Sequence, residues 1–137
     1  MFHGSKVKLD VIKTCEHPLS NKDSEKIAFA TSDGYVAASF IPKWGDNDFE
    51  HGNISDGDKK MWYMKEMYPN AFKLLETDGY IHELDPKTFY RNEKLGLLEE
   101  YITNEELIPL KISYISNVKT YIEGYFTLFK YDEEVVL

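Results

Sequence analysis

Short apolar runs, separated by polar and turn-forming residues, dominate the pattern along the chain. A run over 26–30 is bounded by polar residues and predicts a buried strand. Alternating apolar positions predict strands over 80–84, 107–115 and 125–131, and a further extended segment over 99–102. The chain enters its first strand almost at once, with His3 near the end of that strand, and one short strand is expected around 7–12.

Helical spacing occurs in fewer places. Residues 35–41 form a predicted short helix, with candidate N-caps at 31–33 and Pro42 at its end. Over 59–76 the apolar residues lie close to the helical period, which predicts a helix that Pro69 breaks or restarts. A helical turn is predicted at 117–121. The segment 43–58 contains three of the eight glycines and many Asp and Asn residues, which predicts a loop.

Strands that do not alternate regularly with helices predict an α+β fold with mostly antiparallel sheet. The length of 137 residues fits one domain over 1–137. Apolar residues make up 42% of the chain and aromatics 15%, which is enough for a core and excludes global disorder. The single cysteine, Cys15, excludes an internal disulfide framework and a Cys-rich zinc site, and it favours a reducing compartment.

Charge and hydropathy limit the binding partners and the cellular compartment that can be expected. There are 16 Lys and Arg against 24 Asp and Glu, so the net charge is −8, which argues against general binding to phosphate backbones. No apolar run at the N-terminus has the character of a secretory signal. No stretch approaches the roughly 18–20 apolar residues that a membrane span needs. These features predict a cytoplasmic protein with no membrane partner.

The common signatures of nucleotide and metal sites do not occur in the sequence. It contains neither G-x-G-x-x-G nor a P-loop, so any nucleotide must be held in another way. The four histidines are widely spaced and form no zinc pattern. Four Asp residues between 46 and 58 could attract a divalent cation, but the glycine and closing Glu of an EF-hand loop are missing. A solvated acidic loop is the better interpretation, and no metal is expected.

Three short segments stand out when they are considered together. The first is Phe2–His3–Gly4–Ser5, a His–Gly–hydroxyl sequence at the end of a predicted strand. The second combines Phe29–Ala30–Thr31 with Tyr35–Val36–Ala37–Ala38–Ser39–Phe40, and the third is Glu99–Glu100–Tyr101–Ile102. Taken singly, they would be an ordinary N-terminal histidine, two core aromatics and a surface acidic pair. Their order and separation change that interpretation.

The combination resembles the ADP-ribosyltransferase superfamily, in the branch of diphtheria toxin and the poly(ADP-ribose) polymerases that is named for a His–Tyr–Glu triad. The resemblance spans residues 2 to about 116. It implies split antiparallel sheets with few flanking helices. It also implies a mono-ADP-ribosyltransferase that uses NAD⁺ as substrate, cleaves its nicotinamide–ribose bond and modifies a macromolecular target, most simply a protein. Compact, isolated domains of this kind suggest a toxin-like effector of a bacterium or phage.

The resemblance assigns roles to particular residues. Glu100 would stabilise the oxocarbenium-like transition state through the ribose that carries nicotinamide. His3 would hold the adenosine ribose. Gly4 would let backbone groups approach the nicotinamide amide, because a side chain would block them, and Ser5 would add a hydroxyl contact.

Two aromatic rings would sandwich the nicotinamide by stacking. These are Phe29 and Phe40, and Ala37 would leave room between them. The triad tyrosine of the family is replaced here by Phe29, so stacking survives and a hydroxyl is lost. The segment 43–58 falls where the family has a mobile loop over the cleft, and it either gates the site or is a plain connection.

Several alternatives follow from the same residues. Glu99 competes with Glu100 for the catalytic role, but the Tyr–Ile sequence that follows favours Glu100. Leu98 stands where arginine-specific transferases carry Glu or Gln, which makes arginine a less favoured acceptor. A catalytically inactive member that acts as a protein-binding module is the main alternative function. A tRNA 2′-phosphotransferase relative would need a basic face, and the acidic chain has one arginine, Arg91.

Overall fold

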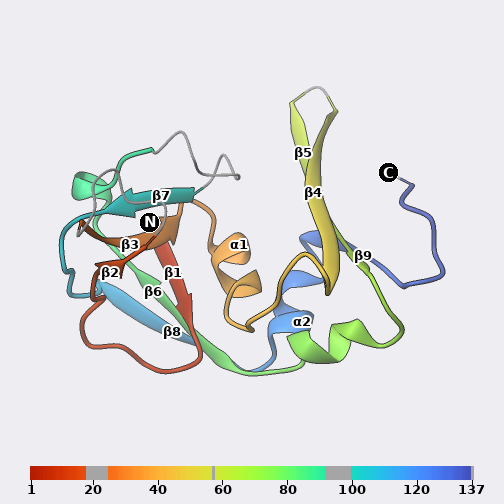
Figure 1. The fold of residues 1–137 in the computed structure, drawn as a ribbon, viewed down its shortest axis with the longest axis horizontal. Helices are drawn as coiled ribbons and strands as arrows, with labels where there is room; N and C mark the ends of the chain where they lie inside the picture. Colours follow the sequence, from red (N-terminus) through yellow and green to blue (C-terminus); the bar gives the residue numbers. More distant parts are fainter. Residues whose placement is uncertain (18–24, 57, 92–99, 137) are drawn as a thin grey trace.

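A computed structural model describes residues 1–17, 25–56, 58–91 and 100–136. In this part of the chain the fold is α+β with two sheets and two short α-helices, which confirms the predicted class (Figure 1). The strands are β1 (Phe2–Ser5), β2 (Cys15–Glu16), β3 (Lys26–Thr31), β4 (Phe49–Asp56), β5 (Lys59–Glu66), β6 (Gly79–Glu83), β7 (Glu100–Thr103), β8 (Lys111–Ile115) and β9 (Phe126–Phe129). The helices are α1 (Gly34–Ser39), α2 (Val118–Ile122) and the 3₁₀ turns η1 (Ala71–Leu75) and η2 (Pro86–Thr88).

The first sheet has the strand order β2-β3-β1-β6-β8, and β7 pairs with β3. All of these pairings are antiparallel. β1 pairs with β6 along its whole length but meets β3 only at Phe2–Thr31, so β1 and β3 diverge beyond that point. The second sheet has the order β4-β5-β9, with β5 and β9 parallel. α1 and α2 lie between the two sheets in Figure 1, and the β4–β5 hairpin projects beyond them.

The largest core cluster joins the helices to the second sheet. Its buried members come from α1, α2, η1 and both sheets, and they include Val36, Ala38, Trp62, Met64, Ile81, Ile115, Val118, Ile122 and Phe126. α1 is short, but it is fixed at its start because the Asp33 carboxylate accepts hydrogen bonds from the first backbone N–H groups. This packing holds α1 against the first sheet and the second sheet at once.

The prediction of a helix over 59–76 is wrong. Residues 59–66 form β5, and the 3₁₀ turn η1 follows Pro69. Trp62, Met64 and Glu66 are buried at alternate positions, whereas Met67 is 47% exposed. The spacing of Met61, Met64 and Met67 imitated a helical period, but pairing with β4 and β9 satisfies the backbone along a strand.

The prediction of a loop over 43–58 is also wrong over Phe49–Asp56, which form β4. The strand expected around 7–12 is reduced to one bridge, between Ile12 and Leu107, and the strand expected from 107 starts only at Lys111. The strands predicted at 26–30, 80–84 and 125–131 and the helices at 35–41 and 117–121 are confirmed within a few residues. Leu98, Glu99 and the polar segment 20–24 lie outside the described residues.

Gly4 is required by the contact between β1 and α1. A Cβ atom built at Gly4 would lie 2.2 Å from the carbonyl oxygen of Ala37 and 3.0 Å from a side-chain carbon of Ile41. The oxygen belongs to the backbone of α1, so it cannot move aside as the end of a side chain could. Any side chain at this position must push α1 away from the sheet.

Gly4→Ala is expected to lower the free energy of unfolding by about 3 kcal/mol, because overpacking against backbone has no local remedy. The corresponding fall in Tm is on the order of 10 °C for a domain of this size. Gly45→Ala is the matched control, since a Cβ there meets nothing within 4 Å, and its effect should stay within about 1 kcal/mol. Equal effects of the two substitutions in urea and thermal denaturation would contradict this account.

Candidate functional site

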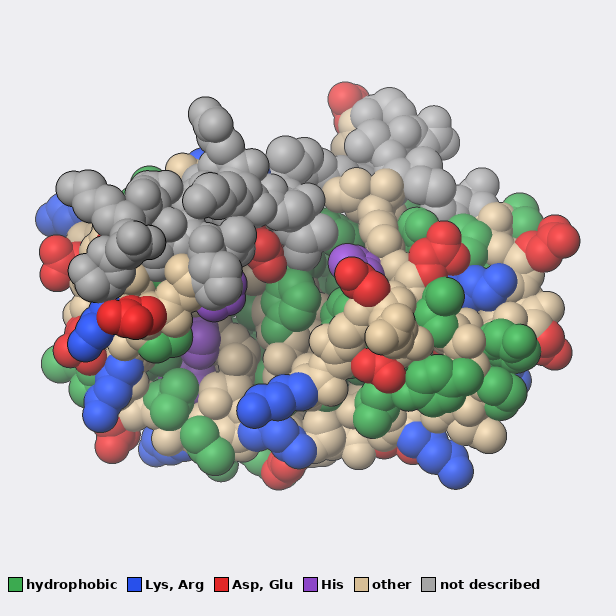
Figure 2. Space-filling model, in the orientation of Figure 1, with side chains coloured by type: hydrophobic (Ala, Val, Ile, Leu, Met, Phe, Trp, Pro, Cys, Tyr) green, Lys and Arg blue, Asp and Glu red, His purple; other side chains and the backbone are tan. Residues whose placement is uncertain are grey.

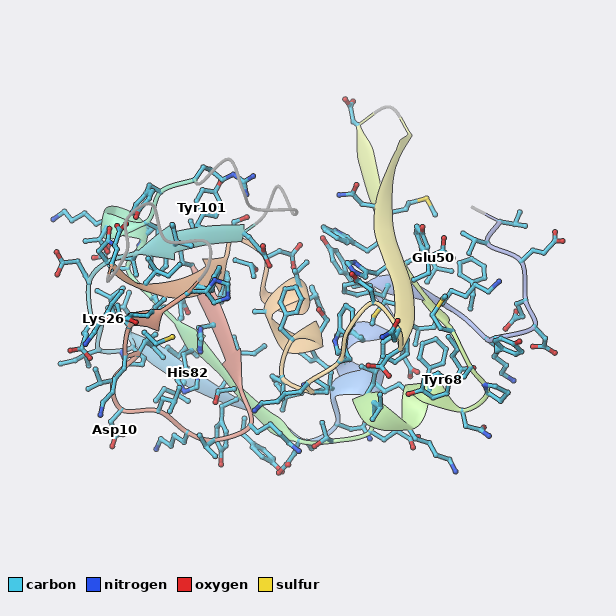
Figure 3. All side chains as sticks on the ribbon, viewed as in Figure 1. Asp10, Lys26, Glu50, Tyr68, His82 and Tyr101 are labelled. Atoms are coloured by element: carbon cyan, nitrogen blue, oxygen red, sulfur yellow. The ribbon has the colours of Figure 1, made fainter. Side chains whose placement is uncertain are left out.

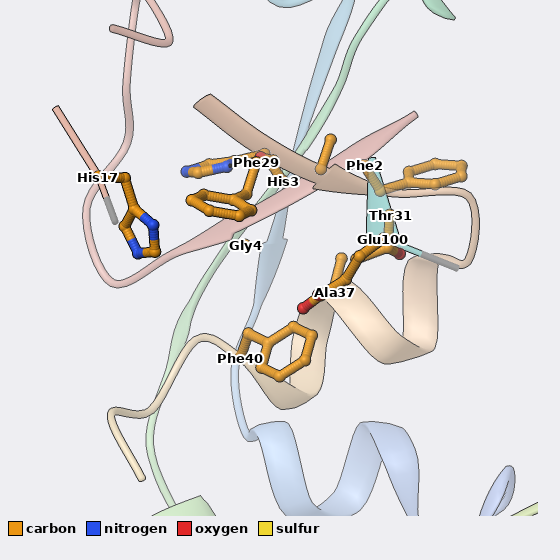
Figure 4. Close-up of a pocket in the computed structure, with 10 residues that line it drawn as sticks. Phe2, His3, Gly4, His17, Phe29, Thr31, Ala37, Phe40 and Glu100 are labelled. Atoms are coloured by element: carbon orange, nitrogen blue, oxygen red, sulfur yellow. Dashed lines mark hydrogen bonds between the residues drawn. The ribbon is translucent and has the colours of Figure 1, made fainter. Parts of the chain in front are cut away.

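A cavity of about 370 Å³ opens between the first sheet and α1. This volume lies in the range of roughly 300–1,000 Å³ that is typical of small-molecule sites. The described residues that line it are Phe2, His3, Gly4, His17, Phe29, Ala30, Thr31, Ala37, Phe40 and Glu100 (Figure 4). The cavity therefore brings together residues from all three of the segments that the sequence analysis singled out.

The divergence of β1 from β3 creates the opening, and His3 spans it. The Nδ1 atom of His3 lies 2.7 Å from the carbonyl oxygen of Phe29, and a carbonyl can only accept, so Nδ1 carries the hydrogen. In the neutral ring Nε2 is then an acceptor. One side-chain hydrogen bond thus fixes the distance between β1 and β3 where the two strands separate. It leaves Nε2 of His3 as an acceptor for a ligand hydroxyl.

His82 fixes His3 from the other side. His82 is fully buried on β6, opposite His3 in the sheet (Figure 3). Its Nδ1–H donates to the carbonyl oxygen of His3 at 3.1 Å, and its Nε2 accepts from the backbone N–H of Leu9 at 2.9 Å. Both ring nitrogens are satisfied, so His82 is a structural residue that joins the first loop to β1.

The backbone of Gly4 faces the cavity side of β1. Met1 and Leu84 exchange two backbone hydrogen bonds, which makes them a hydrogen-bonded pair of the antiparallel ladder. Such pairs alternate with pairs that are not hydrogen-bonded, so the N–H and C=O of Gly4 point away from β6. They point toward the gap that β3 leaves, where they can pair with a planar amide.

Two aromatic rings form opposite walls of the cavity. Figure 4 shows Phe29 on β3 and Phe40 at the end of α1, with Gly4 behind them and Ala37 beside Phe40. Ala37 is buried, and its small side chain leaves the space between the rings open. A flat ring can enter this space and stack on both faces.

His17 lines the cavity beside Phe29 (Figure 4). Its ring meets Phe29 edge to face, with centroids 4.8 Å apart. It is brought there because β2, which ends at Glu16, pairs with β3. The sequence analysis missed His17, and no spacing or motif around it could have revealed its contact with Phe29.

Glu100 supplies a carboxylate to the same cavity. It begins β7 directly opposite Thr31, so it shares a face of the sheet with Thr31 and Phe29. Burial raises the pKa of the Glu100 carboxyl, while the charges of Arg91 and His51 lower it. The Arg91 guanidinium also donates to the backbone carbonyl of Glu100 at 2.5 Å, which fixes the start of the strand.

One predicted contact residue lies elsewhere. Ser5 is not among the described residues that line the cavity, and its hydroxyl accepts a hydrogen bond from the backbone N–H of Val7 at 3.2 Å. Phe2 and Thr31, by contrast, line the cavity although they were quoted only as parts of motifs. Thr31 exchanges hydrogen bonds with the backbone of Asp33, so its hydroxyl serves the turn into α1.

Among the described residues, no group of three or more His, Cys, Asp or Glu side chains could hold a metal ion. In the same part of the chain, none of the helices combines the length and apolar character needed to cross a membrane.

No family model and no curated protein matches the sequence, and no solved structure matches the fold.

The pH dependence of stability should reveal His82. Burial lowers the pKa of His82 from its usual 6.5; the hydrogen bond to the backbone of His3 opposes this shift, and the charge of His3 adds a smaller lowering. The unfolded chain therefore binds a proton at a higher pH than the folded protein does. The stability that neutral His82 contributes is present above the unfolded pKa and is lost as pH falls toward the folded pKa.

His82→Gln is expected to lose one of the two hydrogen bonds and to lower the free energy of unfolding by about 1–3 kcal/mol at neutral pH. Between about pH 7 and pH 5 its unfolding free energy should fall less steeply than that of the wild type. Urea denaturation at a series of pH values measures both quantities. Equal slopes for the two proteins would show that His82 is not a neutral, buried group.

Proposed function

We propose that this protein is a small ADP-ribosyltransferase that uses NAD⁺ as substrate and modifies a protein target. One observation carries the proposal: residues from three distant stretches of the chain line one cavity, with aromatic rings on two opposite walls and a half-buried carboxylate. The split between β1 and β3 supports the finer assignment of an ADP-ribosyltransferase-like fold.

The cavity suits the nicotinamide half of NAD⁺. The ring would stack between Phe29 and Phe40, and its amide would pair with the outward backbone groups of Gly4. The acceptor nitrogen of His3 would take a hydrogen bond from a hydroxyl of the adenosine ribose. The absence of a hydroxyl at Phe29 does not remove any of these contacts, and the His17 ring packs against Phe29 edge to face.

Glu100 would provide the chemistry. Breaking the bond between C1′ of the ribose and nicotinamide leaves positive charge on the ribose, which a nearby carboxylate stabilises. The group has to be ionised for this purpose. Its partial burial strengthens its electrostatic effect on a bound cation, although burial also raises the pKa of the carboxyl.

The charge distribution favours a protein target over a nucleic acid. The net charge is −8, and basic side chains on the face shown in Figure 2 are interspersed with acidic ones. A phosphate backbone would meet repulsion over much of this surface. The same charge speaks against a tRNA 2′-phosphotransferase.

Glu100→Gln tests the proposal directly. It removes the charge but keeps the shape, so NAD⁺ affinity should stay within about threefold while nicotinamide release falls by about 10²–10³-fold. In the wild type, release should also decline on the acid side at a pH above the usual glutamate pKa of 4.5, because protonated Glu100 cannot stabilise the cation. Calorimetry measures binding, and chromatography of free nicotinamide measures the reaction.

Glu105→Gln is the matched control, since Glu105 is an exposed carboxylate just beyond the same strand, and it should behave as the wild type. With labelled NAD⁺ and a cell lysate, wild type should label specific protein bands and Glu100→Gln should not. A wild-type protein that neither binds NAD⁺ nor releases nicotinamide would instead support the inactive binding module.

A further inference from the structure

A second histidine lines the cavity, and the proposed function gives it no contact with the ligand. His17 follows β2, is exposed, and is one of the described residues that line the cavity. Its ring meets that of Phe29 edge to face, with an angle of 73° between the ring planes. In the view of Figure 4, His17 and Glu100 lie on opposite sides of the space between Phe29 and Phe40. The imidazole therefore lies at the cavity itself, on the side away from the carboxylate.

The first sheet sets the position of His17. β2 pairs with β3, and in this register Cys15 lies opposite Ile27. Ile27 is fully buried in a cluster with Ile102, and Phe29 packs against the same cluster. His17 comes directly after this paired strand and contacts the Phe29 ring. Its place beside the cavity is thus a consequence of strand pairing and of core packing under the same strand.

The phosphates of NAD⁺ have no partner in the contacts described so far. NAD⁺ carries two negatively charged phosphates, and a chain with a net charge of −8 can hold them only through local donors. The described residues that line the cavity include neither Lys nor Arg. Arg91 is not among them, and its guanidinium donates to the backbone carbonyl of Glu100 and lies 5.7 Å from the centre of the Tyr101 ring. The donor has to come from another kind of side chain.

With Glu100 ionised, three of the described lining residues have a side-chain N–H or O–H group, namely His3, Thr31 and His17. Nδ1–H of His3 donates to the carbonyl oxygen of Phe29, and its Nε2 in the neutral ring is an acceptor, which a phosphate oxygen avoids. The Thr31 hydroxyl donates to the backbone carbonyl of Asp33 at 2.6 Å. His17 is the remaining lining side chain with an N–H group, and an imidazole carries at least one N–H whether it is neutral or protonated.

We propose that His17 binds the pyrophosphate of NAD⁺ by donating an N–H group to a phosphate oxygen. This inference rests on the NAD⁺ binding that the proposed function requires. The two rings and Gly4 would then recognise nicotinamide, and His17 would recognise the charged link that follows it. The cavity would in this way select nicotinamide nucleotides over the nucleoside that lacks a phosphate.

The course of the ligand agrees with this assignment. In the proposed function Glu100 holds the ribose that carries nicotinamide, and His3 holds the adenosine ribose. The pyrophosphate joins the two riboses, so it has to pass from the Glu100 side of the cavity to the His3 side. His3 and His17 both contact Phe29, one through its backbone oxygen and the other through its ring. His17 therefore lies beside the end of this path.

Three ligands that share the nicotinamide ring test the assignment. Nicotinamide riboside has no phosphate, nicotinamide mononucleotide has one phosphate and no adenosine, and NAD⁺ has both. His17→Phe keeps an aromatic ring against Phe29 and removes the N–H group. It is expected to weaken the binding of NAD⁺ and of the mononucleotide about tenfold, and to leave the affinity for the riboside within about twofold.

The dissociation constants are measured by calorimetry in the Glu100→Gln background, which keeps all three ligands intact. Lys26→Gln is the matched control, since Lys26 is an exposed cation on the neighbouring strand and is not among the described residues that line the cavity. It removes a positive charge from the same strand pair. Its three affinities should stay within about twofold of those of the parent protein, because exposed charges that do not touch the ligand are screened.

The outcomes separate His17 from the proposed function. Unchanged affinities for all three ligands overturn the role of His17 and leave the proposed function standing. A loss for NAD⁺ but not for the mononucleotide places His17 at the adenosine and overturns the phosphate assignment. An equal loss for all three ligands shows that His17 only supports the Phe29 ring, and it also overturns the assignment. A wild type that binds no NAD⁺ overturns both proposals, whereas one that binds NAD⁺ without releasing nicotinamide overturns the transferase alone.

Discussion

The separation of β3 from β1 is the constraint on which the cavity depends. After the single pair Phe2–Thr31 the two strands part, although both remain in the first sheet. Backbone groups that lose a strand partner need another one. The bond from His3 to the carbonyl oxygen of Phe29 satisfies one such group and sets the width of the gap, and the buried ring of His82 fixes the backbone of His3 in turn. The cavity is therefore a site where one histidine side chain, that of His3, takes the place of the lost pairing between β1 and β3.

Because α1 closes the gap between β1 and β3, the residues of α1 and β1 that meet there have to be small. The backbone of α1 lies so close to β1 that Gly4 has no room for a Cβ, and Ala37 and Ala38 are almost completely buried. The family resemblance gave Gly4 a role toward the ligand amide, but its contact with the Ala37 oxygen would demand glycine even without a ligand. The orientation of its N–H and C=O toward the gap is a separate fact, and only this orientation bears on binding. One residue thus meets a packing requirement and offers a binding surface.

Much of the first sheet could be predicted because its signals are local. The apolar run of β3, the alternation in β6 and the caps of α1 each lie within a few residues of the elements they specify. The β4–β5 hairpin could not be predicted in this way. Met61, Met64 and Met67 fit the helical period, whereas the strand buries Trp62, Met64 and Glu66, and the deciding interaction pairs 62–65 with 126–129, far along the chain. The positions of His17 and His51 were not predicted either, because each depends on pairing between two consecutive strands, β2 with β3 and β4 with β5, that the sequence pattern did not indicate.

Because β4 and β5 form a hairpin of the second sheet, the two sheets contribute differently to the site. The first sheet and α1 contribute every described residue that lines the cavity, whereas the second sheet approaches it only through His51 and the aromatic contacts behind Phe40. A planar ring that stacked on Phe40 would also restrict Trp44, because the two rings pack against each other and the indole is bonded to Ser39. Occupation of the cavity would then also restrict His51, whose ring packs edge to face against Trp44.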